Sequence, residues 1–148
     1  MSNHFKHDFE YGKVNFCNSS ENEDRRRGID GFIGTMKVAT RKYRAPLSTY
    51  GTISIRKRQY SKSEYDKIMA KEFEPILYIF DFVDCYIICR VEDIANCLKR
   101  NLFTEKPNPD GLTSGCYIQV GLLPHLLIPK PLVNKDKQTS EISPKILV

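Results

Sequence analysis

One continuous apolar run, Ile76-Leu77-Tyr78-Ile79-Phe80, restricts the fold more than any other part of the sequence. A strand with one face in water alternates apolar and polar residues, whereas a strand covered on both faces reads as an unbroken apolar run. The run is far shorter than the roughly 20 residues that span a membrane. It therefore predicts an interior strand of a sheet that other elements cover on both faces.

A helix is predicted immediately before this strand. Ser61 and Glu64 have the spacing of a capping box, and apolar residues then recur at helical intervals up to Phe73. Pro75 ends the helix because proline cannot continue a helix interior. Similar patterns predict the other elements: a helix from Phe5 to about Tyr11 or Val14, strands over Gly28–Gly34, Met36–Arg44, Tyr50–Arg58, Cys85–Arg90 and Cys116–Val120, and a helix over Val91–Arg100.

Together these elements predict a mixed α/β (α+β) fold with a central mixed sheet in the order helix-strand-strand-strand-helix-strand. The link at residues 45–49 is expected to be a hairpin loop between the second and third strands. The 148 residues are enough for one domain with one core, which we place at residues 1–128. Pro, Lys, Ser and Thr dominate from Pro129 onward and predict a flexible C-terminal tail over residues 129–148.

The cysteines and the N-terminal sequence indicate the compartment. No basic segment followed by an apolar one opens the chain, so we expect a cytoplasmic protein whose five cysteines stay reduced and act as small hydrophobic residues. A zinc site is the alternative reading. Cys85 and Cys89 are four apart on one predicted strand, and His4 and His7 are three apart, although the chain has no CxxC pair.

Basic residues are concentrated in one segment of the chain. Between Arg25 and Lys62 there are eleven Lys and Arg residues and a single acidic residue, Asp30, so this window carries +10 in a chain of net charge +5. The alternative is a solvated surface of balanced ion pairs, but such a surface does not fit a window with almost no counter-charge. The segment predicts contact with a polyanion, and nucleic acid, above all DNA, is the expected partner.

Within this segment, Arg56 and Arg58 share one face of a strand by alternation. The interleaved Tyr43, Tyr50 and Tyr60 could stack on bases or sugars, and the alternative is that their rings pack against the sheet. Arg25–Arg27 could clamp a phosphate or form a solvated charge run. The expected nucleic-acid-binding residues are Arg25, Arg26, Arg27, Arg41, Arg44, Arg56, Lys57 and Arg58.

The element order over about residues 5–90, with the run Gly28-Ile29-Asp30-Gly31-Phe32-Ile33, resembles the core of the PD-(D/E)XK, or restriction-endonuclease-like, nuclease superfamily. In that family an Asp at the start of the second core strand binds a divalent metal. The next strand supplies an acid and, two positions on, a lysine, and an N-terminal helix often adds a Glu. The resemblance implies that Asp30 and Glu10 bind Mg²⁺ or Mn²⁺ and that Lys42 orients or deprotonates the attacking water.

Thr40 departs from the family pattern because it occupies the place of the second acid, and a register shifted by one residue places Ala39 there instead. A carboxylate from elsewhere, such as Glu10 or Glu64, could replace it. The first function that these residues allow is a metal-dependent endonuclease or resolvase-like enzyme acting on DNA phosphodiesters, with Asp30, Lys42 and Glu10 as catalytic residues.

Two other functions are compatible with the same sequence. One is a non-catalytic nucleic-acid-binding protein on the same fold, in which Asp30 could be no more than a turn residue before Gly31. The other is a protein-inhibitor module whose basic face contacts a protein partner. The segment Cys116–Ile128 could add a strand to the sheet or form a homodimer contact.

Overall fold

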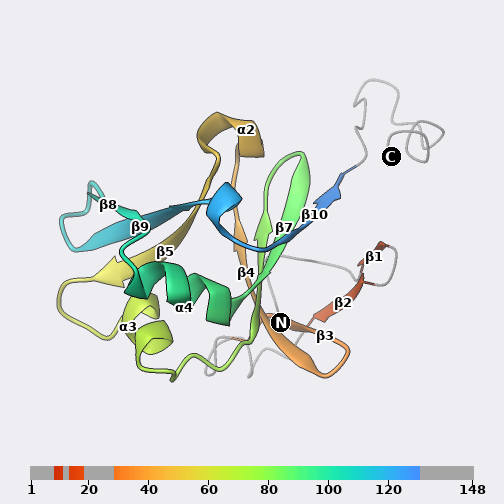
Figure 1. The fold of residues 1–148 in the computed structure, drawn as a ribbon, viewed down its shortest axis with the longest axis horizontal. Coiled ribbons are helices and arrows are strands. Elements are labelled where there is room, and N and C mark those ends of the chain that lie inside the picture. Colours follow the sequence, from red (N-terminus) through yellow and green to blue (C-terminus); the bar gives the residue numbers. More distant parts are fainter. Residues whose placement is uncertain (1–8, 12–13, 19–28, 131–148) are drawn as a thin grey trace.

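Two β-sheets organise the computed structural model of the chain, which describes residues 9–11, 14–18 and 29–130 (Figure 1). The larger sheet has seven strands in the order β1 (Phe9–Tyr11), β2 (Val14–Asn18), β3 (Gly31–Ile33), β4 (Met36–Lys42), β6 (Leu77–Asp81), β7 (Cys85–Arg90) and β10 (Leu126–Pro129). The smaller sheet has three strands in the order β5 (Thr52–Arg58), β9 (Thr113–Gln119) and β8 (Thr104–Pro107). The helices are α2 (Leu47–Tyr50), α3 (Glu64–Met69), α4 (Val91–Lys99) and the 3-10 turn η1 (Val120–Leu122).

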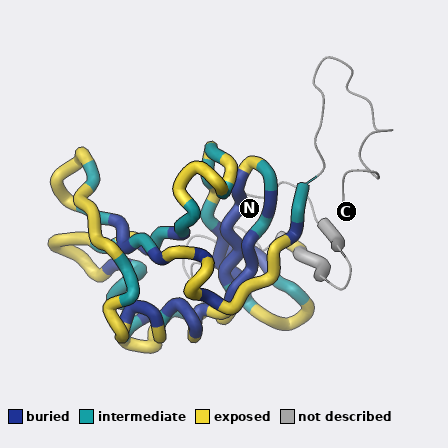
Figure 2. The backbone as a smooth tube through the Cα atoms, turned by 45° about the horizontal axis from the view of Figure 1, so that its top comes forward, coloured by how far each residue is buried: buried dark blue, intermediate teal, exposed yellow. Residues whose placement is uncertain are grey.

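The apolar run is confirmed as the interior strand β6, which pairs in parallel with β4 and antiparallel with β7. Tyr78 and Phe80 are buried in one core cluster, and Ile79 between them is buried in a second cluster. The rings of Tyr78 and Phe80 stack with their centroids 4.3 Å apart. Figure 2 shows the buried residues gathered in the central strands. Because both faces of β6 are covered, a polar residue on either face would lose its water.

The larger core cluster is formed by the larger sheet, the smaller sheet and the two longer helices. Ile55 of β5, Ile118 of β9 and Ile94 of α4 are fully buried in it. The smaller cluster consists of Val38, Ile79, Ile88 and Ile128. Both sheets thus share one core, and the expected mixed α/β single domain with a mixed central sheet is confirmed.

The path of the chain after β4 corrects the expected hairpin at residues 45–49. Helix α2 follows β4, and Gly51 ends this helix in the left-handed conformation with φ of 68°. Strand β5 then pairs with β9 instead of returning beside β4. The place beside β4 is taken by β6, and residues 43–76 form the long crossover that a parallel pair requires.

The cap of helix α3 differs from the expected one by two residues. Ser63 is the N-cap: its hydroxyl accepts from the backbone of Asp66 at 3.2 Å, and the Asp66 carboxylate accepts from the backbone of Ser63 at 3.1 Å. Ser61 is exposed before the helix. The shift leaves Glu64 outside the capping box, so its carboxylate is available to other partners.

Three further expectations need correction or lie outside the described residues. Residues 9–11 form strand β1, so the helix expected from Phe5 to Tyr11 or Val14 is wrong at this point. Strand β8 was not expected, and β10 continues to Pro129, one residue beyond the expected domain boundary. The tail from residue 131 lies outside the described residues. No helix in the described part of the chain has the length and apolar character needed to cross a bilayer.

Candidate nucleic-acid interface

A cavity of about 380 Å³ lies next to Asp30, where β4, β5, β6 and α3 meet. It brings together Asp30 and Lys42, which the resemblance selected, and Glu64, which was considered as a replacement ligand. Arg41 and Arg56 of the predicted binding residues also line it. The complete lining is Asp30, Ala39, Thr40, Arg41, Lys42, Arg56, Glu64, Phe73 and Tyr78.

Asp30 accepts hydrogen bonds from Thr40, the residue that stands where the nuclease family has its second acid. Its Oδ2 accepts from the backbone nitrogen of Thr40 at 2.7 Å and from the Thr40 hydroxyl at 3.1 Å. The backbone nitrogen of Asp30 donates to the carbonyl of Val38 at 2.8 Å, so the residue extends the pairing of β3 with β4. Thr40 therefore donates hydrogen bonds to Asp30. A metal site would instead need a second oxygen ligand at the position of Thr40.

Glu64 is bound to three protein groups. Its Oε1 accepts from the guanidinium of Arg41 at 2.6 Å and from the backbone nitrogen of Arg56 at 3.0 Å, and its Oε2 accepts from the hydroxyl of Tyr78. Burial raises the pKa of Tyr78 well above its ordinary value, so the phenol keeps the proton that it donates. Glu64 thus joins α3 to both sheets, and binding a metal would break these contacts.

Arg41 places a permanent positive charge in the wall of this cavity. Burial opposes that charge, but the neighbouring Tyr78 and Glu64 outweigh burial and raise the pKa of Arg41. The Nε of Arg41 is buried and has no hydrogen-bond partner among the described residues. At the rim, Lys42 and Arg56 are exposed. The cavity therefore combines engaged carboxylates with cations that face solvent.

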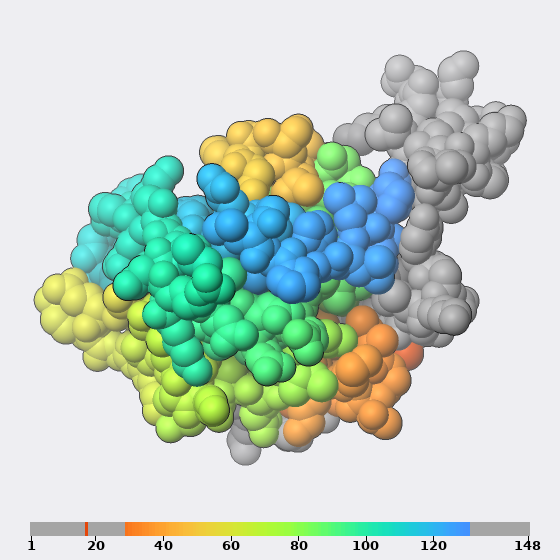
Figure 3. Space-filling view, viewed as in Figure 1, coloured from red at the N-terminus to blue at the C-terminus, as the bar shows by residue number. Residues whose placement is uncertain are grey.

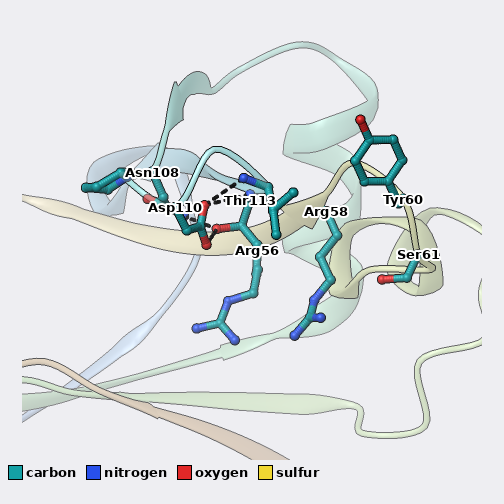
Figure 4. Close-up of a pocket in the computed structure, with 9 residues that line it drawn as sticks. Arg56, Arg58, Tyr60, Ser61, Asn108, Asp110 and Thr113 are labelled. Carbon is teal, nitrogen blue, oxygen red and sulfur yellow. Dashed lines mark hydrogen bonds between the residues drawn. The ribbon is translucent and has the colours of Figure 1, made fainter.

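Arg56 also lines a second, open cavity of about 530 Å³ (Figure 4). Arg58, Tyr60 and Ser61 form one side of it, and the turn between β8 and β9 forms the other. Sequence reasoning missed this cavity because the pairing of β5 with β9 cannot be predicted from either strand alone. The signal that could have helped is the turn Asn108-Pro109-Asp110-Gly111, which the structure places beside the end of β5.

The remaining predicted binding residues lie elsewhere. Lys57 is 3.4 Å from the carboxylate of Glu105 and 4.6 Å from the ring centroid of Tyr65, so it contacts the protein itself. Arg44 is exposed after β4 and lines neither cavity. Arg25–Arg27 lie outside the described residues.

Glu10 does not come from a helix, as the resemblance implied. It lies on β1, which β2 and β3 separate from β4, and its side chain is outside what the structure describes. Within the described ranges no group of three or more His, Cys, Asp or Glu side chains could hold a metal ion. The residues around Asp30 therefore do not fit the two-carboxylate Mg²⁺ or Mn²⁺ site that the resemblance implies.

The zinc alternative also finds no support among the described cysteines. Cys85 and Cys89 are buried on β7 and unbridged. Burial raises the pKa of their thiols to about 11 and about 12. The two thiols therefore stay protonated at neutral pH in the metal-free protein.

Comparisons with models of protein families, with curated proteins and with solved structures gave no significant match to this chain.

Proposed function

We propose that this protein binds nucleic acid through the phosphate backbone and does not cut it. The observation that carries the proposal is a contrast between the acids and the bases that line the two cavities. The acids accept hydrogen bonds from protein donors: Asp30, Glu64 and Asp110. The exposed bases Lys42, Arg56 and Arg58 make no ion pair with any described residue, whereas the less exposed Arg41 is paired with Glu64.

Three exposed cations without an ion-pair partner among the described residues are suited to phosphate oxygens. Lys42 ends β4, and Arg56 and Arg58 lie on β5, so both sheets contribute. Phosphate contacts release counterions and give binding that weakens steeply with salt. Such contacts position a nucleic acid without reading its bases, so the proposed binding has no strong sequence preference.

A metal-dependent nuclease is the second candidate, because Asp30 and Lys42 line one cavity. Hydrolysis of this type needs carboxylates that are available to the metal. Thr40 donates to Asp30, and Glu64 is paired with Arg41. This arrangement supports binding over hydrolysis.

Fluorescence anisotropy with labelled single-stranded and duplex DNA at about 50 and 200 mM salt tests the proposal. We expect salt-sensitive binding to at least one form. Lys42→Ala, Arg56→Ala and Arg58→Ala should each weaken binding and reduce the salt slope by about one. Lys99→Ala is the matched control, since Lys99 is exposed on α4 and lines neither cavity. Absence of binding at low salt would overturn the proposal and favour a protein partner.

Incubation of the same DNA with Mg²⁺, with Mn²⁺ and with chelator separates binding from cutting. Asp30→Asn is the suitable variant because it removes the charge but keeps an oxygen that can accept from Thr40. We expect no cleavage by either protein, and binding by Asp30→Asn that equals or exceeds that of the wild type. Metal-dependent products that disappear in Asp30→Asn would establish the nuclease instead.

A further inference from the structure

The cavity beside the end of β5 has features that go beyond phosphate binding. Arg56 and Arg58 occupy alternate positions of β5, and their guanidinium groups point the same way in Figure 4. At roughly 3.3 Å per residue, the two side chains start about 6.6 Å apart. Tyr60 and Ser61 continue this wall after the strand ends. The lining therefore contains two cations and an aromatic ring, and in Figure 4 the ring of Tyr60 points away from the two guanidinium groups.

The opposite wall is a turn that the chain holds in one shape. Asp110 accepts from the backbone nitrogens of Leu112 and Thr113 at 2.9 Å each and from the Thr113 hydroxyl at 2.7 Å. The Thr113 hydroxyl also accepts from the amide of Asn108 at 2.8 Å. The backbone nitrogen of Gln59 donates to the carbonyl of Leu112 at 3.0 Å and so ties the turn to β5. These bonds fix the width of the cavity before any ligand arrives, which reduces the entropy lost on binding.

Asp110 is the one carboxylate in the lining of this cavity. The hydrogen bonds from Thr113 and Leu112 lower its pKa and occupy its oxygens. Two guanidinium groups outnumber this single charge, so the cavity is cationic overall. An anionic group is therefore attracted to the arginine side.

Tyr60 is the most exposed aromatic residue in the described part of the chain, with 80% of its surface in water. It stands on the loop between β5 and α3, which projects from the left edge of the molecule in Figure 3. Its ring stacks on no other described ring. Leu112 across the cavity is also 55% exposed. A flat ring could rest on Tyr60 and cover apolar surface that water now covers.

We propose that this cavity holds a single-stranded nucleic acid, with Arg56 and Arg58 on phosphates of the strand and Tyr60 stacked on an unpaired base. The inference rests on the proposed nucleic-acid binding and names the form of nucleic acid that the site selects. A volume of about 530 Å³ lies within the range of ligand cavities, roughly 300–1,000 Å³. In a duplex the base faces are already stacked and cannot reach a protein ring, so duplex DNA can use only the arginines.

Anisotropy titrations with single-stranded oligothymidine, an abasic strand of equal length and duplex DNA test this inference. Base–aromatic stacking contributes about 1–3 kcal/mol per base, so Tyr60→Ala should weaken oligothymidine binding about 5- to 150-fold. Its binding to the abasic strand and the duplex should change less than about twofold. Tyr60→Phe should bind oligothymidine like the wild type, because it keeps the ring.

Tyr50→Ala is the matched control, since Tyr50 is 74% exposed but does not line the cavity. It should bind all three strands like the wild type. Equal oligothymidine affinity of Tyr60→Ala and wild type would overturn the inference while leaving nucleic-acid binding in place. Equal losses of affinity for duplex DNA and for oligothymidine in Tyr60→Ala would overturn the inference as well. A wild type that binds none of the three strands would overturn both the inference and the proposed function.

Discussion

The hydroxyl oxygen of Tyr43 lies 2.9 Å from the backbone nitrogen of Ser54 and 3.1 Å from its side-chain oxygen. Tyr43 directly follows β4 of the larger sheet, and Ser54 is on β5, the edge strand of the smaller sheet. Two residues further along β5, the backbone nitrogen of Arg56 donates a hydrogen bond to the carboxylate of Glu64. Side chains thus occupy backbone groups that an edge strand otherwise offers to another chain.

Tyr43→Phe should lower the free energy of unfolding by about 1–2 kcal/mol, because the amide of Ser54 loses its partner. Urea unfolding followed by circular dichroism measures the change. Tyr50→Phe is the control, since Tyr50 is exposed and should change stability by less than about 0.5 kcal/mol. Equal stability of Tyr43→Phe and wild type would show that the bond does not hold the sheets together.

Glu64→Gln should cost about 2–4 kcal/mol, because it leaves the partly buried guanidinium of Arg41 without its counter-charge. The comparison is Glu72→Gln, which removes the exposed partner of Lys62 and should cost less than about 1 kcal/mol. Thermal and urea unfolding of both variants give the two values. A loss for Glu64→Gln no larger than that for Glu72→Gln would contradict this view of Glu64.

Ser63→Ala should cost about 1 kcal/mol, since the first turn of α3 loses its cap. Ser61→Ala should leave stability within about 0.5 kcal/mol of the wild type, because Ser61 is exposed and lies outside the box. Parallel urea titrations of the two variants decide between the caps. A larger loss of stability for Ser61→Ala than for Ser63→Ala would show that Ser61 and Glu64 form the capping box.

Alkaline pH should destabilise the fold through Cys89. Burial raises the pKa of its thiol from 9.0 to about 12. Above pH 9 the unfolded chain loses this proton while the folded chain keeps it, so the free energy of unfolding falls between pH 9 and about 12. The decline is at most about 1.4 kcal/mol per pH unit for one such group.

Urea unfolding at several pH values from 8 upward measures this decline. Cys89→Ala should have a shallower pH dependence than the wild type, and Cys17→Ala should keep the full dependence because Cys17 is exposed. A Cys89→Ala variant with the wild-type pH profile would assign the decline to other groups, such as Cys85 and Cys116, whose thiols also have raised pKa values.

Local patterns were sufficient to predict the elements whose environment is uniform along their length. The unbroken apolar run identified β6, and the second apolar stretch, Cys85–Cys89, identified β7 at its observed bounds, Cys85–Arg90. The apolar spacing of Ile94 and Leu98 identified α4, because both side chains face the same core. These patterns record which face is buried, and burial was the property that they predicted correctly.

Pairing between distant strands could not be predicted in the same way. The alternation of β5 is equally compatible with β4 or β9 as a partner, because alternation states only that one face is buried. Asp30 and Lys42, which the resemblance selected, line one cavity, whereas the cavity beside Tyr60 required the turn at Asp110 to meet β5. Glu64 was expected in a cap because its spacing from Ser61 fits one, although its carboxylate binds Arg41 instead.

The crossover between β4 and β6 has a consequence for how the chain acquires its structure. Strand β5 and helix α3 lie within it, and β5 completes its pairing only with β9, which ends at residue 119. Pairing between such distant segments slows folding, so we expect refolding over milliseconds to seconds. During synthesis Ile53 and Ile55 leave the ribosome long before β9 exists to cover them. The strand that carries Arg56 and Arg58 is thus among the last to mature on a nascent chain.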